Sequence, residues 1–466
     1  MISSAAKNMT ISSLIEIQEL LSKKDMASWD LCWGQLENDT DIRIKYYGAY
    51  ITGLVKLISD KKVKRVILIS KDRAYFLAGF LAALHAGVGV VISQTDVPSI
   101  LQNLLQPGDS ILTDQESLVG TIDCCISMKN VNFDSDSITA FEPFNPDQSF
   151  ITFYTSGSTG DPKPIVKSIT QLNAEVSDLH SKWGLNKGVF ISTVPHYHLY
   201  SLMFSLLWPV CSGYPLRRFT YCFWEELLAD CVDNNYIISS PIHLCRLPSL
   251  EQGLQKPIEY IFSAGAVLPP AAIETSQNVL GVTPTEIYGS TETGCIAYRQ
   301  QFKAAEPWTA FQNVMLKSGI DNKLCVKSDY LPNADYFQTE DMVSFEDDNK
   351  FHLLGRADRI AKIEGKRISL VEIEQKLQKL DIFNKIVVLE IKTEIRAELG
   401  IIATLSNHGQ HRLDVVGKTK FINENRQYLR TYFDGVVVPK KWRFVDEMPV
   451  NEQGKSPQSL LKSCFM

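Results

Sequence analysis

The chain has 466 residues, which at roughly 100–200 residues per domain corresponds to two to four domains. Hydrophobic residues make up 45% of it and charged residues 21%, close to the globular average, which excludes a disordered or fibrous chain. The formal net charge of −6 argues against a general nucleic-acid binder, because such proteins are usually basic.

The first clear elements along the chain are two apolar strands separated by a helix. Val66–Ile69 is a short β-branched run, Tyr75–His85 has a helical composition, and Val88–Ile92 is a second apolar run. This spacing predicts a βαβ unit in a parallel sheet that is covered on both faces. Similar strand-like runs recur farther along the chain and predict an α/β fold: Ser149–Tyr154, Val189–Val194, Tyr236–Ser239 and Tyr260–Phe262.

Three features of the sequence bear on the cellular compartment of the protein. The N-terminal residues lack the apolar core of a secretory signal, and the apolar stretch 76–92 is too short and too interrupted by His85 and glycines to span a membrane. None of the ten cysteines forms a C-x-x-C pair or a zinc-like cluster with histidine. We therefore expect a cytoplasmic protein with no membrane span.

Charge is distributed unevenly between the two ends of the chain. Residues 359–466 contain 19 Lys and Arg against 13 Asp and Glu, whereas the rest of the chain is acidic. This asymmetry predicts a separate basic C-terminal domain that meets an anionic partner, although a surface asymmetry without any partner would give the same counts.

The strongest local pattern is a loop rich in glycine and hydroxyl residues that follows the strand predicted at Ser149–Tyr154. Glycines allow the backbone N–H groups to curl inward, hydroxyl groups add donors, and a lysine adds positive charge, all of which suit a polyphosphate. Pro164 after the lysine excludes a Walker A loop, and a flexible Ser/Gly turn is the simpler alternative. The residues concerned are Thr155, Ser156, Gly157, Ser158, Thr159, Gly160 and Lys163.

At these residues the sequence resembles the adenylate-forming (AMP-binding) superfamily, which includes acyl-CoA synthetases, aryl-CoA ligases and adenylation domains of nonribosomal peptide synthetases. The resemblance recurs in the family's order over residues 60 to 457, and this order makes it specific. The further matching segments are Pro195–Leu202, Ser263–Ala266, Tyr288–Gly294, Thr339–Asp341, Leu354–Lys362, Gly365–Arg367 and Pro449–Lys455.

The resemblance implies an α/β architecture in two parts. Residues 1–357 would form a large N-terminal adenylation body with layered sheets and helices. Residues 358–466 would form a small mobile α+β lid domain that swings about Asp358.

It also implies a site for ATP and Mg²⁺. Tyr288 would stack on adenine, Asp341 would hold the ribose hydroxyls, Arg356 would reach the ribose or phosphate, and Glu292 would bind Mg²⁺. The chain departs from the family at Thr339–Asp341, where glycine often occupies the middle of an expected turn, and we expect a side chain to be tolerated there. The remaining nucleotide contacts would come from the glycine-rich loop together with Gly265, Ala266, Gly289, Ser290 and Thr291.

The implied reaction joins a carboxylic acid to AMP, releases pyrophosphate, and then passes the acyl group to a thiol. The resemblance implies catalytic roles for four residues. Thr155 and Lys163 would act at the phosphates, and His198 would lie near the substrate carboxyl. The charge of Lys455 would offset the negative charge that builds at phosphorus.

Pro195–Leu202 holds no acidic residue that could bind an α-amino group, so we expect a fatty or aromatic acid as the substrate. Coenzyme A and the phosphopantetheine of a separate acyl carrier protein both remain open as the acceptor, with a preference for the carrier. The alternative from another class is a non-catalytic protein that binds nucleotide or ligand on the same fold. The retention of Lys163, Glu292, Asp341 and Lys455 disfavours it.

Overall fold

The protein is described here by a computed structural model. The structure describes residues 47–134, 144–156, 162–185, 188–248, 254, 256–302, 306–363, 366–392, 397–450 and 456–465. For a few of these, including Thr155, Ser156, Pro162 and Asp358, it describes the backbone alone.

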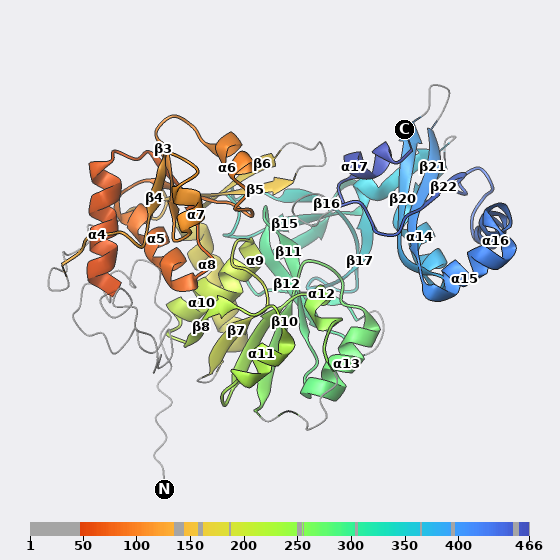
Figure 1. Cartoon of the computed structure of the whole chain (residues 1–466). Helices are drawn as coiled ribbons and strands as arrows, with labels where there is room; N and C mark the ends of the chain where they lie inside the picture. The colour runs from red at the N-terminus through yellow and green to blue at the C-terminus, as the bar shows by residue number, and fades with distance from the viewer. Residues whose placement is uncertain are drawn as a thin grey trace, which may run out of the picture.

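The first sheet has six strands in the order β4-β3-β1-β2-β5-β6 and lies toward the N-terminal end of the described chain (Figure 1). The predicted βαβ unit is confirmed, since β1 and β2 are parallel, with Val66 opposite Val90, and α5 connects them. The strands are β1 (Arg65–Ile69), β2 (Gly89–Ile92), β3 (Asp109–Thr113), β4 (Cys125–Ser127), β5 (Phe150–Ser156) and β6 (Pro162–Ser168).

Alternate residues of β1 face opposite sides of this sheet, and both sides are covered. Val66 and Leu68 pack into the main core, whereas Ile67 and Ile69 join a smaller cluster on the other face. This arrangement explains why the strands are apolar throughout, as the sequence predicted. The helices of this part are α4 (Tyr47–Asp60), α5 (Arg73–His85), α6 (Pro98–Leu104) and α7 (Glu116–Val119).

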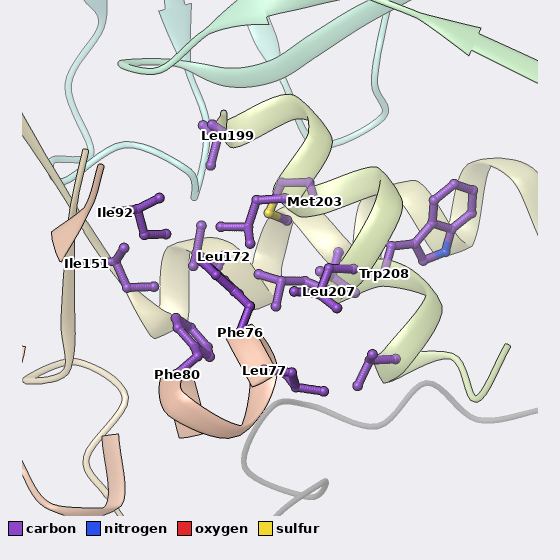
Figure 2. Close-up of a cluster of buried hydrophobic side chains, with 14 of the residues drawn as sticks. Phe76, Leu77, Phe80, Ile92, Ile151, Leu172, Leu199, Met203, Leu207 and Trp208 are labelled. Atoms are coloured by element: carbon purple, nitrogen blue, oxygen red, sulfur yellow. The ribbon is translucent and has the colours of Figure 1, made fainter. Parts of the chain in front are cut away.

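Helix α5 is buried from Arg73 to Leu84, which accounts for its lack of a polar face. It begins at Asp72, whose side chain accepts hydrogen bonds from the backbone N–H groups of Ala74 and Tyr75. Figure 2 shows side chains of this helix meeting those of the first sheet, of α8 (Ile169–Trp183) and of the helical segment 199–211. This cluster joins the first sheet to the second, and its labelled members are Phe76, Leu77, Phe80, Ile92, Ile151, Leu172, Leu199, Met203, Leu207 and Trp208.

The second sheet has eleven strands in the order β14-β15-β16-β17-β13-β12-β11-β10-β9-β7-β8. The pairings among strands β7 to β11 are parallel, and all pairings from β11–β12 onward are antiparallel. The strands predicted at 189–194, 236–239 and 260–262 are confirmed as β7, β9 and β10. The parallel strands are β7 (Val189–Ser192), β8 (Leu216–Thr220), β9 (Asn235–Ser239), β10 (Ile258–Ser263) and β11 (Thr285–Ser290).

The antiparallel part of this sheet begins at β12, which forms a hairpin with β11. Its strands are β12 (Gly294–Gln300), β13 (Trp308–Ala310), β14 (Met315–Ser318), β15 (Lys323–Lys327), β16 (Phe337–Phe345) and β17 (Lys350–Arg356). The helical segments between the strands are α9 (Leu199–Leu202), a π-helix η1 (Met203–Leu207), α10 (Trp208–Cys211), α11 (Trp224–Ala229), α12 (Pro241–Leu244), α13 (Pro270–Leu280) and a 3₁₀ turn η2 (Ile320–Asn322).

The C-terminal segment, drawn in blue in Figure 1, has a hydrophobic cluster of its own, formed by residues between Ala361 and Trp442. A two-stranded sheet pairs β18 with β19, and a three-stranded sheet has the order β20-β21-β22. Its elements are η3 (Ala357–Arg359), β18 (Ile360–Ile363), β19 (Lys366–Ser369), α14 (Leu370–Gln378), β20 (Phe383–Lys392), β21 (Ala397–Leu405), α15 (Asn407–Val416), α16 (Lys418–Arg430), β22 (Lys441–Phe444) and α17 (Gln458–Ser463).

Within the described part of the chain, no helix combines the length and the apolar character needed to cross a lipid bilayer.

Candidate active site

Three of the predicted site segments lie at the carboxyl edge of the parallel strands of the second sheet. Segment Pro195–Leu202 follows β7, Ser263–Ala266 continues from the end of β10, and Tyr288 lies near the end of β11. Strand β10 pairs in parallel with both β9 and β11, so these strands end at the same edge. In open α/β sheets, ligands bind outside this edge.

Tyr288 and Asp341, which the sequence assigned separately to adenine and ribose, are in direct contact. The Tyr288 hydroxyl donates a hydrogen bond of 2.7 Å to Asp341 Oδ2. Burial, followed by the neighbouring Asp341 carboxylate, raises the pKa of Tyr288, so the phenol keeps its proton and remains a donor. The Tyr288 ring packs against Trp308 and Phe351, with centroid distances of 5.4 and 5.9 Å.

Arg356 joins this pair from the neighbouring strand. It lies opposite Asp341 in the β16–β17 ladder, and its Nη1 is 3.7 Å from Asp341 Oδ1. Half of the Arg356 side chain and 21% of the Asp341 side chain are exposed. The carboxylate therefore has a hydrogen-bond donor on Oδ2 and a cation near Oδ1, and it still faces solvent.

The expected turn at Thr339–Asp341 is wrong, because these residues lie within strand β16. The ladder between β15 and β16 is irregular at this point. The Glu340 carboxylate reaches Lys323 Nζ on β15, at 2.8 Å. A side chain is tolerated in the middle of this motif because it is exposed at a β-bulge.

The hairpin between β11 and β12 forms a tight turn that carries Glu292. The backbone N–H of Ser290 donates to Thr293 Oγ1 at 3.1 Å, and the N–H of Thr293 donates to Ser290 Oγ at 3.2 Å. Gly289 lies so close to the facing strand that a Cβ on it would be 2.0 Å from the Gly294 carbonyl oxygen. The glycine of this motif is therefore required by the hairpin itself.

Glu292, the predicted metal ligand, is half-buried on this turn. Its backbone carbonyl accepts a hydrogen bond of 2.7 Å from Lys167 Nζ. In the described part of the chain, no three side chains of His, Cys, Asp or Glu gather as a metal cluster. A single carboxylate fits Mg²⁺ that is bound mainly by substrate phosphates and water.

Ser263 ends β10 at the same edge. It is 1% exposed, and its Oγ is buried without a hydrogen-bond partner. Such atoms are uncommon in folded proteins and indicate a place where a partner is missing. The predicted nucleotide contacts Gly265 and Ala266 follow it in the chain and are exposed.

The two histidines of the Pro195–Leu202 segment lie in different environments. His198 is exposed and precedes the first residue of α9. His196 is fully buried, with its Nε2 3.0 Å from the carbonyl oxygen of Ser70 and its ring against Phe76. Burial, and then the nearby Arg73, hold the pKa of His196 well below its usual value, so this ring is neutral and structural.

The glycine-rich loop connects two adjacent antiparallel strands. Thr155 lies opposite Lys163, and Ser156 opposite Pro162, so strands β5 and β6 close the loop from both sides. The Lys163 side chain is exposed. The loop residues 157–161 lie outside the described residues, as do the side chains of Thr155 and Ser156.

Two further predicted residues are described incompletely. Lys455 lies outside the described residues, and only the backbone of Asp358, within η3, is described. The next residue, Arg359, binds the C-terminal elements, donating to the Glu374 carboxylate on α14 and to the Val388 carbonyl oxygen at 3.1 Å.

Sequence reasoning missed a buried pair behind the Glu292 turn, Lys167 on β6 and Glu175 on α8. The exposed fractions of these residues are only 2% and 1%. The signal that could have revealed them is a charge where the pattern expects an apolar residue. Lys167 falls within a strand, and Glu175 lies beside Val176 on the buried side of α8.

Comparison with known proteins agrees with this geometry. A family model described as AMP-binding enzyme matches residues 52–316, which is more than half of the chain. The chain therefore belongs to the AMP-binding enzyme family, as the motifs predicted.

Individual relatives are distant in sequence. The chain is 23% identical over 453 residues to the D-alanine–D-alanyl carrier protein ligase of Staphylococcus haemolyticus, covering 86% of this chain and 90% of that protein. It is 24% identical over 228 residues to the 4-coumarate–CoA ligase of Cereibacter sphaeroides, covering 47% of this chain and only about half, 51%, of that protein.

Among solved structures, the chain is similar to O-succinylbenzoate coenzyme A synthetase from Bacillus subtilis in complex with AMP. The TM-score is 0.72 at 18% identity, with 90% of this chain and 92% of that chain covered. This likeness confirms the predicted fold class, a mixed α/β protein with layered sheets and helices in an N-terminal body followed by a C-terminal domain.

Proposed function

We propose that this protein is an AMP-forming acid–thiol ligase. It would activate a carboxylic acid as the acyl-adenylate at the expense of ATP, release pyrophosphate, and then transfer the acyl group to a pantetheine thiol. Family membership supports the adenylation step. The choice of acid, the acceptor and the roles of single residues are our proposals.

The observation that carries the proposal is the contact of Tyr288, Asp341 and Arg356 at the carboxyl edge of the second sheet. A carboxylate oriented by a phenol on one oxygen, and still partly exposed, can accept hydrogen bonds from two neighbouring hydroxyl groups of a ribose. The aromatic ring beside it offers a surface for a base. The unpartnered Ser263 hydroxyl at the same edge supports a ligand there, because a bound nucleotide would supply the missing partner.

The phosphate side of the site would be formed by two turns. Glu292 would hold Mg²⁺, which would neutralise negative charge on the phosphates. Thr155, Lys163 and the glycine-rich loop would bind the phosphates with hydroxyl, ammonium and backbone N–H donors. Lys455 would stabilise the charge that develops when the carboxylate attacks phosphorus, and His198 would lie near the substrate carboxyl.

We further propose that residues 1–357 and 358–466 are separate domains and that Asp358 is the hinge between them. Arg356 belongs to the β16–β17 ladder of the body, whereas Arg359 is bound to the C-terminal elements. Only two residues separate these anchors, which is the length expected of a hinge.

For the substrate we propose a fatty or aromatic acid, because Pro195–Leu202 holds no carboxylate for an α-amino group. A carrier-protein thiol is our first choice of acceptor, and coenzyme A the second. The excess of basic residues in 359–466 would attract an acidic carrier, and a relative that matches most of the chain is named as a carrier-protein ligase.

The first test is acid-dependent exchange of pyrophosphate into ATP over a panel of fatty, benzoic and cinnamic acids, with D-alanine as the amino-acid arm. Exchange with one aliphatic or aryl class is expected. Exchange with D-alanine alone would overturn the proposed acid class. The absence of exchange throughout, from folded protein, would refute adenylation of these acid classes.

The role of Lys455 is tested in the same assay. Lys455→Ala should lower exchange by about 100-fold, the scale for losing one charged group at a reacting centre, without lowering the melting temperature. Lys462→Ala, in the same C-terminal segment, is the matched control and should retain full exchange. Normal exchange by Lys455→Ala would show that the lysine acts elsewhere.

A further inference from the structure

Lys167 is a buried ammonium group that reaches two backbone carbonyls from different parts of the second sheet. It lies on β6, is 2% exposed, and donates 2.7 Å hydrogen bonds to the carbonyl oxygens of Glu292 and Tyr330. Glu292 is on the β11–β12 turn, and Tyr330 follows β15. One side chain therefore ties the first sheet to two segments of the second.

Burying this charge is costly, and desolvation lowers the pKa of Lys167. Both of the acceptors are neutral, so a nearby carboxylate has to offset the charge. The carboxylate with the largest effect is that of Glu175 on α8, whose charge opposes the desolvation and favours the protonated form, raising the pKa of Lys167. Because the desolvation cost offsets most of what its contacts contribute to stability, a buried charge bound to backbone carbonyls is better explained by the backbone geometry that it fixes.

Glu175 also contacts the β11–β12 turn, at the residues that follow Glu292. Its Oε1 accepts the backbone N–H of Cys295 at 2.9 Å. A Cβ built on Gly294 would be only 2.7 Å from Glu175 Oε2, so the carboxylate packs directly against the turn. The turn is thus bound from behind at Glu292 by Lys167 and at Cys295 by Glu175.

The second carbonyl partner of Lys167 is fixed as well. The Tyr330 hydroxyl donates to Asp178 on α8, one helical turn beyond Glu175. Asp178 also accepts from the Asn313 amide. The backbone that Lys167 binds therefore belongs to a hydrogen-bonded network that includes Tyr330, Asp178 and Asn313.

We propose that Lys167 is a positioning residue for the Mg²⁺·ATP site. It fixes the turn that carries the Glu292 carboxylate to β6, the strand that returns from the glycine-rich loop, so that the metal ligand and Lys163 on that strand keep a set separation. Lys167 itself touches neither metal nor nucleotide. This inference rests on the proposed function, in which Glu292 and that loop bind Mg²⁺ and phosphates.

The test is the Mg²⁺ dependence of ATP binding and of pyrophosphate exchange in Lys167→Met, which removes the ammonium and keeps most of the volume. We expect the half-saturating Mg²⁺ concentration to rise about tenfold, as for losing one charge-assisted hydrogen bond, while kcat at saturating Mg²⁺ changes less. Lys182→Met, on an exposed lysine at the end of α8, is the matched control and should titrate as the wild type.

Two further variants separate positioning from stability. In Lys167→Met/Glu175→Gln both buried charges are removed, which limits the destabilisation expected when Glu175 is left unpaired, and the Mg²⁺ shift should remain. In a Glu292→Gln background, Lys167→Met should add little to the Mg²⁺ requirement, because both changes act through the same carboxylate. A merely structural role would add its effect in full.

The outcomes are distinguishable from those of the proposed function. If the wild type binds no Mg²⁺·ATP by calorimetry, the nucleotide site itself is refuted, and the positioning role with it. If the wild type binds and a folded Lys167→Met protein, or the double variant, keeps the wild-type Mg²⁺ titration, only the positioning role is refuted.

Discussion

The hydrogen bond between Tyr288 and Asp341 offers the sharpest test of the nucleotide site. Tyr288→Phe deletes the hydroxyl and leaves the ring against Trp308 and Phe351. A hydrogen bond to a charged acceptor contributes about 1.5–3 kcal/mol. Because Asp341 is partly exposed and keeps Arg356 nearby, we take the lower end, about 1.5 kcal/mol, which corresponds to roughly a tenfold change in affinity.

We therefore expect Tyr288→Phe to raise the KM for ATP about tenfold in pyrophosphate exchange, with kcat nearly unchanged, because the carboxylate is present but no longer oriented. Calorimetric titration with Mg²⁺·ATP should show the same loss of affinity. Tyr298→Phe makes the same substitution on the adjacent strand β12 and should leave the KM unchanged. An unaltered KM in folded Tyr288→Phe protein would refute the view that this hydroxyl orients the ligand-binding carboxylate.

Three other predictions concern stability. The pKa of His196 is held well below its usual 6.5, so only the unfolded chain gains this proton, and stability falls as pH drops below 6.5. Below pH 6.5, the free energy of unfolding measured in urea should fall less steeply for His196→Gln than for the wild type, by up to about 1.4 kcal/mol per pH unit. Gly289→Ala forces a Cβ against the Gly294 carbonyl and should cost about 1–3 kcal/mol with loss of ATP binding, whereas normal binding would refute the tight hairpin. Arg359→Ala removes the cation beside the Glu374 carboxylate, whose pKa burial already raises. The free energy of opening of α14, measured by hydrogen exchange, should fall by about 2 kcal/mol. Unchanged exchange would contradict this anchor.

The sequence predicted the parallel unit of the first sheet, the apolar strands that the second sheet contains, and the order of the site motifs. The strands β1, β7, β9 and β10 are short apolar runs covered on both faces, and this burial pattern is local to each strand. The β11–β12 turn is likewise encoded locally, because Gly289 has to meet the facing strand without a side chain.

The geometry around Asp341 was not readable in the same way. Resemblance to the family led us to expect a turn at Thr339–Asp341, yet the neighbouring strands draw these residues into β16 with a bulge. Strand pairing is decided by partners far away in the sequence, so local preference yields to tertiary context. The meeting of Tyr288 with Asp341, 53 residues apart, depends on the order of strands in the sheet.

The sequence by itself determined which chemical groups are available: the hydroxyl and glycine loop, the carboxylates of Glu292 and Asp341, and the ammonium groups of Lys163 and Lys455. Only the tertiary structure decided which of them act together. In the sequence, Lys167 is only an unexpected charge within a strand. In the structure, its ammonium group donates a hydrogen bond to the backbone carbonyl of Glu292, 125 residues away. The physical reason is that a buried charge must find partners wherever the packed chain brings polar groups within reach, and no local pattern specifies that place.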